Sequence, residues 1–142
     1  MNGFQIKKIL VPLDGSQTSF HGLEKAIYFA RQCQAEITGL CIAYVPPSLA
    51  FEAVENIDTV TRKTIDGFLE KAKTICGKHG INFHGEVDLG QPGPKILEYA
   101  NRWNFDLIVI GSRGAGSTDE SFIGSVANHI IQRTTIPIVI VK

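Results

Sequence analysis

The chain has 142 residues, of which 44% are hydrophobic, and its 14 basic side chains balance 14 acidic ones. This length suits one domain over residues 1–142. A formal charge of zero argues against general nucleic-acid binding, which needs a surplus of basic residues. The sequence has no apolar signal core at its start and no run long enough to span a membrane. Cys33, Cys41 and Cys76 are odd in number and widely spaced, which is typical of reduced thiols, so we expect a cytoplasmic protein with no membrane partner.

The N-terminal third predicts strand, helix and strand. Residues 9–13 form a short apolar run that indicates a buried strand, and the turn at 14–16 starts a helix over 16–32. Residues 36–45 are rich in β-forming side chains and predict a second strand, which the two prolines at 46–47 end. The first helix carries apolar residues at helical spacing: Phe20, Leu23, Ile27 and Ala30.

The middle of the chain predicts a long helix and a strand near the sheet edge. A loop over 47–51 leads to a helix over 52–78, and residues 82–89 alternate between apolar and polar side chains, as a strand with one wetter face does. The turn at 90–94 opens the next helix, with Pro94 suited to its first position. The expected apolar side of the long helix is Ile57, Val60, Thr64, Phe68, Ala72 and Ile75, and that of the next helix is Ile96, Ala100 and Trp103.

The C-terminal third predicts a buried strand over 106–110, a glycine-rich loop, a helix over 125–134 and a last apolar strand over 136–141. Helices that alternate with strands indicate parallel strands and right-handed crossovers. We therefore expect an α/β fold with a single open, doubly wound, five-stranded parallel sheet of the flavodoxin-like type, in strand order 3-2-1-4-5. Ligands of such sheets bind beyond the carboxyl ends of the strands where the order reverses, here between the first strand and the fourth.

The glycine-rich loop departs from two common phosphate-binding motifs by one residue each. Asp119 stands where the dinucleotide fingerprint needs its last glycine, and Ser117 stands where a Walker A motif needs its lysine. The pattern that does fit is Gly111-x2-Gly114-x9-Gly124-Ser125. Glycines let backbone N–H groups approach phosphate oxygens, and the start of the following helix favours negative charge.

This spacing resembles the nucleotide-binding motif of the universal stress protein family, in its ATP-binding branch. Residues 7–16 and 137–141 are also similar to the two ends of that family, so the resemblance covers essentially the whole chain. It implies the family's adenine-nucleotide alpha hydrolase-like fold, a stress-response or regulatory role, and a homodimer through the last strand. The nucleotide-binding residues that it implies are Pro12, Asp14, Ile42, Gly111, Arg113, Gly114, Gly124, Ser125 and Val126.

Each of these assignments has a plainer interpretation. The glycines can be turn residues, Asp14 can cap the first helix, and Arg113 can be a solvated loop side chain. Asp119 and Glu120 bring two carboxylates into the loop, where they would repel a triphosphate, face a bound Mg²⁺ or point into solvent. The choice between ATP and AMP or ADP therefore stays open.

We expect an adenine-nucleotide-binding regulatory protein with at most slow ATP hydrolysis, because no general base or lysine clamp is evident. Neither catalytic residues nor a metal-binding pattern of cysteines and histidines stand out. The competing hypothesis is a nucleotide-independent interaction module in which the glycine loop is only structural. In both cases the apolar last strand predicts self-association, since an exposed sheet edge is a template for a second copy.

Overall fold

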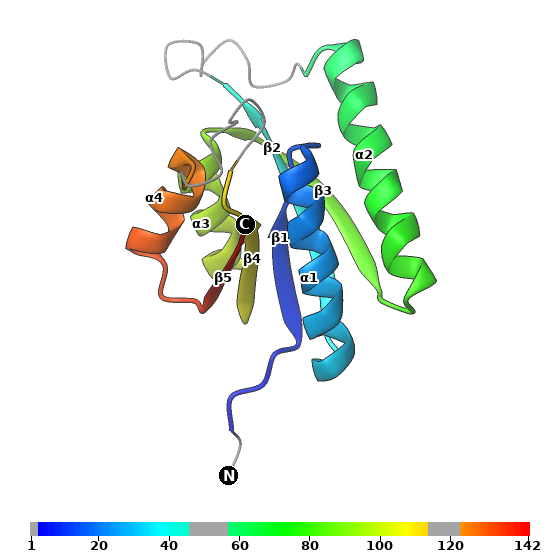
Figure 1. Ribbon diagram of the computed structural model, residues 1–142. Helices are drawn as coiled ribbons and strands as arrows, with labels where there is room; N and C mark the ends of the chain where they lie inside the picture. Colours follow the sequence, from blue (N-terminus) through cyan, green and yellow to red (C-terminus); the bar gives the residue numbers. More distant parts are fainter. Residues whose placement is uncertain (1–2, 46–56, 114–122) are drawn as a thin grey trace.

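The computed structural model describes residues 3–45, 57–113 and 123–142, which form one parallel sheet between two layers of helices (Figure 1). Strands and helices alternate along the chain. The strands are β1 (Lys8–Pro12), β2 (Glu36–Tyr44), β3 (Phe83–Gly90), β4 (Leu107–Gly111) and β5 (Ile138–Val141). The helices are α1 (Gln17–Cys33), α2 (Thr59–Lys78), α3 (Pro92–Arg102) and α4 (Ser125–Arg133).

The strand order is β3-β2-β1-β4-β5, and every strand pair is parallel. The expected α/β fold and strand order are therefore confirmed. β1 lies at the centre, with Ile9 opposite both Ile37 of β2 and Leu107 of β4. The chain leaves β1 toward β2 on one side and returns through β4 on the other, so the order reverses between β1 and β4 as predicted.

Each face of the sheet has its own apolar core. α1 and α2 cover one face, where Leu23 and Ala72 pack with Ile9 and Val11. α3 and α4 cover the other face, where Ile96 and Ile130 pack with Leu10 and Ile108. Because β1 and β4 have buried side chains on both faces, they are apolar at nearly every position, as sequence analysis expected of central strands.

β3 is the edge strand that its alternation predicted. Phe83 and Val87 point into the core beside α2, whereas His84, Glu86 and Asp88 are exposed. The opposite edge is β5, which is apolar throughout and only partly buried.

α2 differs from its predicted start and its predicted apolar face. The segment 46–56, which includes the expected loop and the expected first turn, lies outside the described residues. α2 begins at Thr59 because the Asp58 carboxylate caps it, with Oδ1 accepting the N–H of Thr61 at 2.8 Å. Val60 is 76% exposed, and Thr64 is also exposed. The other four predicted residues, Ile57, Phe68, Ala72 and Ile75, do pack on the core. The fully buried residues of the helix are Ile65, Leu69, Ala72 and Cys76.

α3 also differs from expectation at both ends. It starts at Pro92 rather than Pro94, and it ends at Arg102. Trp103 is the C-terminal cap and is 49% exposed, so it does not share the buried face of Ile96 and Ala100. The last two elements are shorter than predicted: α4 ends one residue earlier, and β5 starts at Ile138 because Ile136 turns back to bond the Thr134 hydroxyl. Among the helices of the described ranges, none is long and apolar enough to cross a membrane.

Gly39 of β2 is expected to tolerate no side chain. A Cβ there would lie 2.5 Å from Phe83 Cζ and 2.8 Å from Leu13 Cδ1, inside the packed core. We expect Gly39→Ala to lower the free energy of unfolding by about 1–3 kcal/mol through overpacking. Gly67→Ala is the matched control, because a Cβ at Gly67 meets nothing within 4 Å on the exposed side of α2 and should add about 0.5–1 kcal/mol. Urea unfolding measures the free energy of unfolding of both variants. Equal changes in the two would contradict the close packing around Gly39.

Candidate functional site

A cavity of about 350 Å³ opens at the carboxyl ends of β1 and β4, at the point where the strand order reverses. It is bounded by the end of β2, by the first turns of α1 and α3, and by the start of α4. Its lining residues are Pro12, Leu13, Asp14, Ser19, Leu40, Ile42, Pro92, Ile96, Ile110, Gly111, Ser112, Arg113, Gly124, Ser125, Val126 and Ala127.

The residues predicted as a site come together in this cavity. Eight of the nine line it: Pro12, Asp14, Ile42, Gly111, Arg113, Gly124, Ser125 and Val126. The ninth, Gly114, lies outside the described residues, as do Asp119 and Glu120. The other lining residues were not predicted. Among them, Pro92 and Ile96 come from α3 and Leu40 from the interior of β2, where only Ile42 was predicted.

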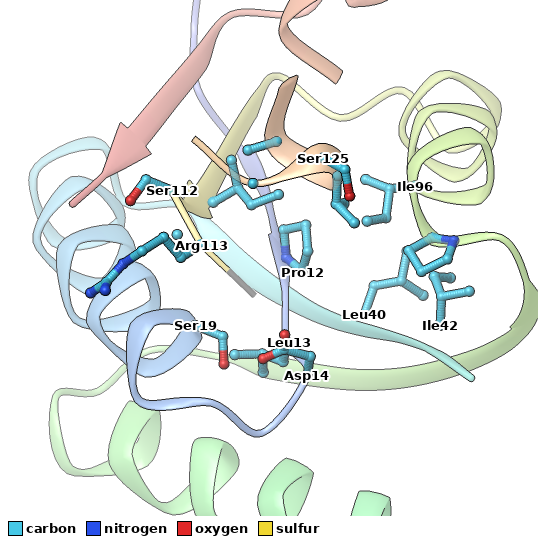
Figure 2. A pocket seen from close by; sticks show the side chains of 16 residues that line it. Pro12, Leu13, Asp14, Ser19, Leu40, Ile42, Ile96, Ser112, Arg113 and Ser125 are labelled. Carbon is cyan, nitrogen blue, oxygen red and sulfur yellow. The ribbon is translucent and has the colours of Figure 1, made fainter. Parts of the chain in front are cut away.

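The lining combines apolar and polar side chains, and Figure 2 shows how the labelled ones lie. Leu40 and Ile42 lie together on one side of the view, and Ile96 lies above them next to Ser125. Arg113, Ser19 and Asp14 lie away from that apolar group. The cavity can therefore contact a flat apolar group at the β2 end and meet charged groups near β4 and α1.

The start of α1 is capped by a polar side chain of the turn before it. Ser16 is the N-cap, and its Oγ accepts the N–H of Ser19 at 3.1 Å. Asp14 does not cap the helix itself, because its Oδ1 accepts the N–H of Ser16 at 2.9 Å and so holds the turn before the cap. Asp14 remains exposed at the cavity wall. It therefore both orders the turn and presents a carboxylate to the cavity.

The starts of α3 and α4 lack the side-chain caps that α1 and α2 have. Neither Gln91 nor Gly124, their N-cap residues, makes a side-chain cap bond, whereas Ser16 and Asp58 do. Ser125 is the first residue of α4 and not its cap. The first N–H groups of a helix have no partner within the helix and carry a partial positive charge. The two uncapped helices are the two whose first residues line the cavity beside β4 and β2.

Ser112 connects the cavity wall to the edge of the sheet. Its N–H donates to the carbonyl of Val141 in β5 at 2.7 Å, and its carbonyl accepts the N–H of Gly124 at 2.6 Å. Only 2% of Ser112 is exposed, and its Oγ is the one buried side-chain oxygen or nitrogen of the described residues that has no hydrogen-bond partner. No role was predicted for Ser112, although it stands between Gly111 and Gly114 of the motif.

Gly111 lies against the first turn of α1. A Cβ at Gly111 would come within 2.8 Å of the Thr18 carbonyl oxygen, so a larger residue would push β4 and α1 apart. On the other side of the cavity, the His129 ring of α4 covers Gly93 of α3, with its Cγ 2.9 Å from the position of a Cβ there. These two glycine contacts set the spacing of the helices around the cavity.

The Cys41 thiol, next in sequence to the lining residue Ile42, is expected to be unreactive. Burial, followed by the charge of Asp14, raises the pKa of Cys41 to about 11. Cys41 precedes the lining residue Ile42, but its side chain belongs to the core on the α1 side. Near neutral pH the thiol is almost wholly protonated, so it is a poor nucleophile.

The sequence matches the family model of the universal stress protein family over residues 5–142. It is 31% identical to universal stress protein MJ0531 of Methanocaldococcus jannaschii over 139 residues, which cover 96% of this chain and 82% of the relative. It is also 31% identical to universal stress protein YxiE of Bacillus subtilis over 149 residues, covering 95% of this chain and 98% of the relative.

Solved structures show the same fold. The protein MJ0577, whose biochemical function was assigned from its structure, has a TM-score of 0.85 at 25% identity, with 97% of this chain and 96% of that chain covered. A universal stress protein from Archaeoglobus fulgidus in complex with dAMP has a TM-score of 0.75 at 18% identity, covering 99% and 100%. An Arabidopsis thaliana protein of the family with AMP bound has a TM-score of 0.70 at 18% identity, covering 96% and 91%.

Ser112 and Ser16 are expected to respond oppositely to loss of their hydroxyl groups. Ser16→Ala removes the cap of α1 and should lower the free energy of unfolding by about 1 kcal/mol. Ser112→Ala removes a buried hydroxyl that has no partner, so stability should stay the same or rise. Denaturant unfolding of the two variants provides the comparison. A loss at Ser112 as large as that at Ser16 would mean that its hydroxyl has a stabilising partner.

Proposed function

Because the chain belongs to the universal stress protein family, we propose that it binds an adenine nucleotide, ATP in the first place, in the cavity between β1 and β4. The proposed role is regulatory, in a stress response. The observation that carries the proposal is that the uncapped start of α4 and the predicted site residues line one cavity.

The phosphate groups would bind at the start of α4. The N–H groups of Ser125, Val126 and Ala127 precede the first hydrogen bond within the helix, which Asn128 donates to Gly124 at 2.9 Å. Such N–H groups and the helix dipole favour an anion. Arg113, which also lines the cavity, would add a positive charge and a pair of donors suited to phosphate oxygens.

The base would lie against the apolar residues of the cavity, with the ribose nearer Asp14. Leu40, Ile42 and Ile96 form an apolar surface that fits the flat face of a base. The exposed Asp14 carboxylate is suited to accept hydrogen bonds from ribose hydroxyl groups. The neighbours solved with AMP and dAMP support an adenine nucleotide on this fold.

Any hydrolysis should be slow. Among the described lining residues, Asp14 is the one carboxylate, and neither a lysine nor a histidine is present. Fast phosphoryl transfer needs both charge stabilisation and a group that orients the attacking water. A Mg²⁺ bound with ATP would be held largely by the phosphates.

We also propose a homodimer formed through β5. The carbonyls of Pro137 and Val141 accept hydrogen bonds from β4, so by alternation the backbone groups of Ile138 and Ile140 face away from the sheet. These side chains are apolar and only partly buried. This edge also supports the competing function, an interaction module that works without nucleotide. The three free cysteines are consistent with a cytoplasmic location for either function.

Ser125→Asp tests the proposed phosphate position without weakening the helix. A carboxylate in the first turn favours the helix dipole, so thermal stability should not fall, but it would repel a phosphate at the same place. We expect the affinity for ATP, measured by calorimetric titration with Mg²⁺, to fall roughly tenfold or more, and that for AMP to fall less. Asn128→Asp is the matched control, because it places the same charge on exposed α4 surface one turn away.

Titration of the wild type with ATP, ADP and AMP, with and without Mg²⁺, separates the two functions. Binding of none of them would favour the interaction module. If Ser125→Asp binds ATP as tightly as the wild type does, the phosphates do not bind at the start of α4.

Ile140→Pro tests the proposed dimer. Proline would remove an N–H that faces away from β4, so the bonds between β4 and β5 should remain while pairing with a second copy is lost. We expect sedimentation equilibrium to show a dimer for the wild type and a monomer for the variant, with circular dichroism confirming that the variant is folded. A wild type that sediments only as a monomer at micromolar concentration would sink the proposal.

A further inference from the structure

We propose that the end of the sheet opposite the nucleotide cavity is a docking surface for an acidic segment of a partner protein. This basic surface consists of the cations around a hollow at the amino ends of β1, β2 and β3, together with Trp103 at the end of α3. The inference concerns a second surface and does not depend on the proposed nucleotide site.

The parallel topology brings the last turns of all four helices to this end of the molecule (Figure 1). Each helix leads from the carboxyl end of one strand to the amino end of another, so the helices end beside the amino ends of the strands. Every helix carries a basic residue in its last turn, and two lysines stand at the start of β1. The cations gathered at this end are Lys7, Lys8, Arg31, Lys78, Arg102 and Arg133.

The helix dipoles account for only part of this arrangement. A basic residue in the last turn faces the negative end of the dipole, which explains one cation per helix but not Lys7 and Lys8. The carboxylates of the described residues at this end are Glu36, which pairs with His84 at 3.6 Å, and Asp106. Oδ2 of Asp106 accepts the N–H groups of Lys7 and Lys8 at 2.9 and 3.0 Å. Positive charge therefore exceeds negative charge here, although the formal charge of the chain is zero.

The hollow has cations that are available to a partner. Its volume is about 660 Å³, and it lies between the ends of α1 and α2, where Lys7, Arg31 and His79 line it. All three side chains are exposed. Neither Lys7 nor Arg31 belongs to an ion pair of the described residues. A carboxylate that entered the hollow could accept two hydrogen bonds from the Arg31 guanidinium and a third from Lys7.

Trp103 adds an aromatic group to the same surface. It is the one tryptophan of the chain, its side chain is half-exposed, and the Arg102 guanidinium lies 5.3 Å from the centre of its ring. Nζ of Lys8 donates to the Trp103 carbonyl and lies over the Phe105 ring. Lys8 also lines the hollow, so it connects Trp103 to the cations there. Tryptophan and arginine are the residue types that most often dominate the binding energy of protein interfaces.

The surroundings favour a short acidic segment over a longer polyanion. The adjacent edge strand β3 exposes Glu86 and Asp88, which would repel a nucleic-acid strand that extended past the hollow. A flat bilayer would not enter a hollow between two helix ends. Glutamate or aspartate side chains of a peptide can reach into the hollow, while a neighbouring side chain of the same peptide contacts Trp103.

The probe is a fluorescein-labelled peptide of six glutamates, with a peptide of six glutamines as its uncharged counterpart. We expect fluorescence anisotropy at low ionic strength to show binding of the first and not of the second, with an affinity that falls as salt is added. Lys7→Gln combined with Arg31→Gln should weaken binding roughly fivefold, because exposed ion pairs each contribute little. Lys25→Gln combined with Lys63→Gln is the matched control, which removes the same charge from exposed positions away from the hollow.

No binding of the glutamate peptide, or equal weakening in the two double variants, would overturn the inference. Tighter binding of an eight-nucleotide oligothymidylate or of phosphatidylglycerol vesicles, lost in the Lys7→Gln and Arg31→Gln variant, would overturn the acidic segment in favour of a nucleic acid or a membrane. The glutamate peptide should shift the emission of Trp103, and an unchanged emission would remove Trp103 from the surface. Nucleotide affinity should be the same in this variant as in the wild type, since neither residue lines the nucleotide cavity.

Discussion

The pairing of β1 with β4 is the constraint on which the rest of the structure depends. Ile9 and Leu10 lie opposite Leu107 and Ile108, although nearly a hundred residues separate the two strands. The chain continues from β1 through α1 on one face and from β4 into α4 on the other. The two connections diverge, so the carboxyl ends of the strands have no common cover. The cavity is thus a consequence of topology, and the residues at those ends determine what it can hold.

Two of the helices around the cavity begin without a side-chain cap. α1 and α2 have such caps, whereas α3 and α4 do not. The loss of stability is small, because a glycine N-cap such as Gly124 costs roughly a few tenths of a kcal/mol, and Pro92 and Pro94 have no N–H group to cap. The start of α4 is held instead by backbone, through the bond from Gly124 to Ser112, and Ser112 is held in turn by Val141. One residue therefore holds the start of α4 against the edge strand, while the first residues of that helix line the cavity.

The sequence predicted the fold because buried strands and turn residues are short-range signals. The site residues were implied by the resemblance to the family, and eight of the nine line one cavity. Two kinds of feature could not be predicted. The fully buried residues of α2 depend on how the helix packs on the sheet, which periodicity alone does not determine. Pro92 and Ile96 reach the cavity only because α3 packs over β2.

The two edges of the sheet are protected in different ways, and this difference links the edges to the cavity. β3 exposes His84, Glu86 and Asp88, and charges of this kind oppose pairing with another chain. β5 is apolar, with Pro137 before it and Lys142 after it as its modest protection. The edge with charged side chains borders the apolar end of the cavity, and the apolar edge is joined through Ser112 to the start of α4. The two edges therefore differ in how readily a second chain could pair with them, and β5, the edge without charged side chains, is the one joined to the cavity wall.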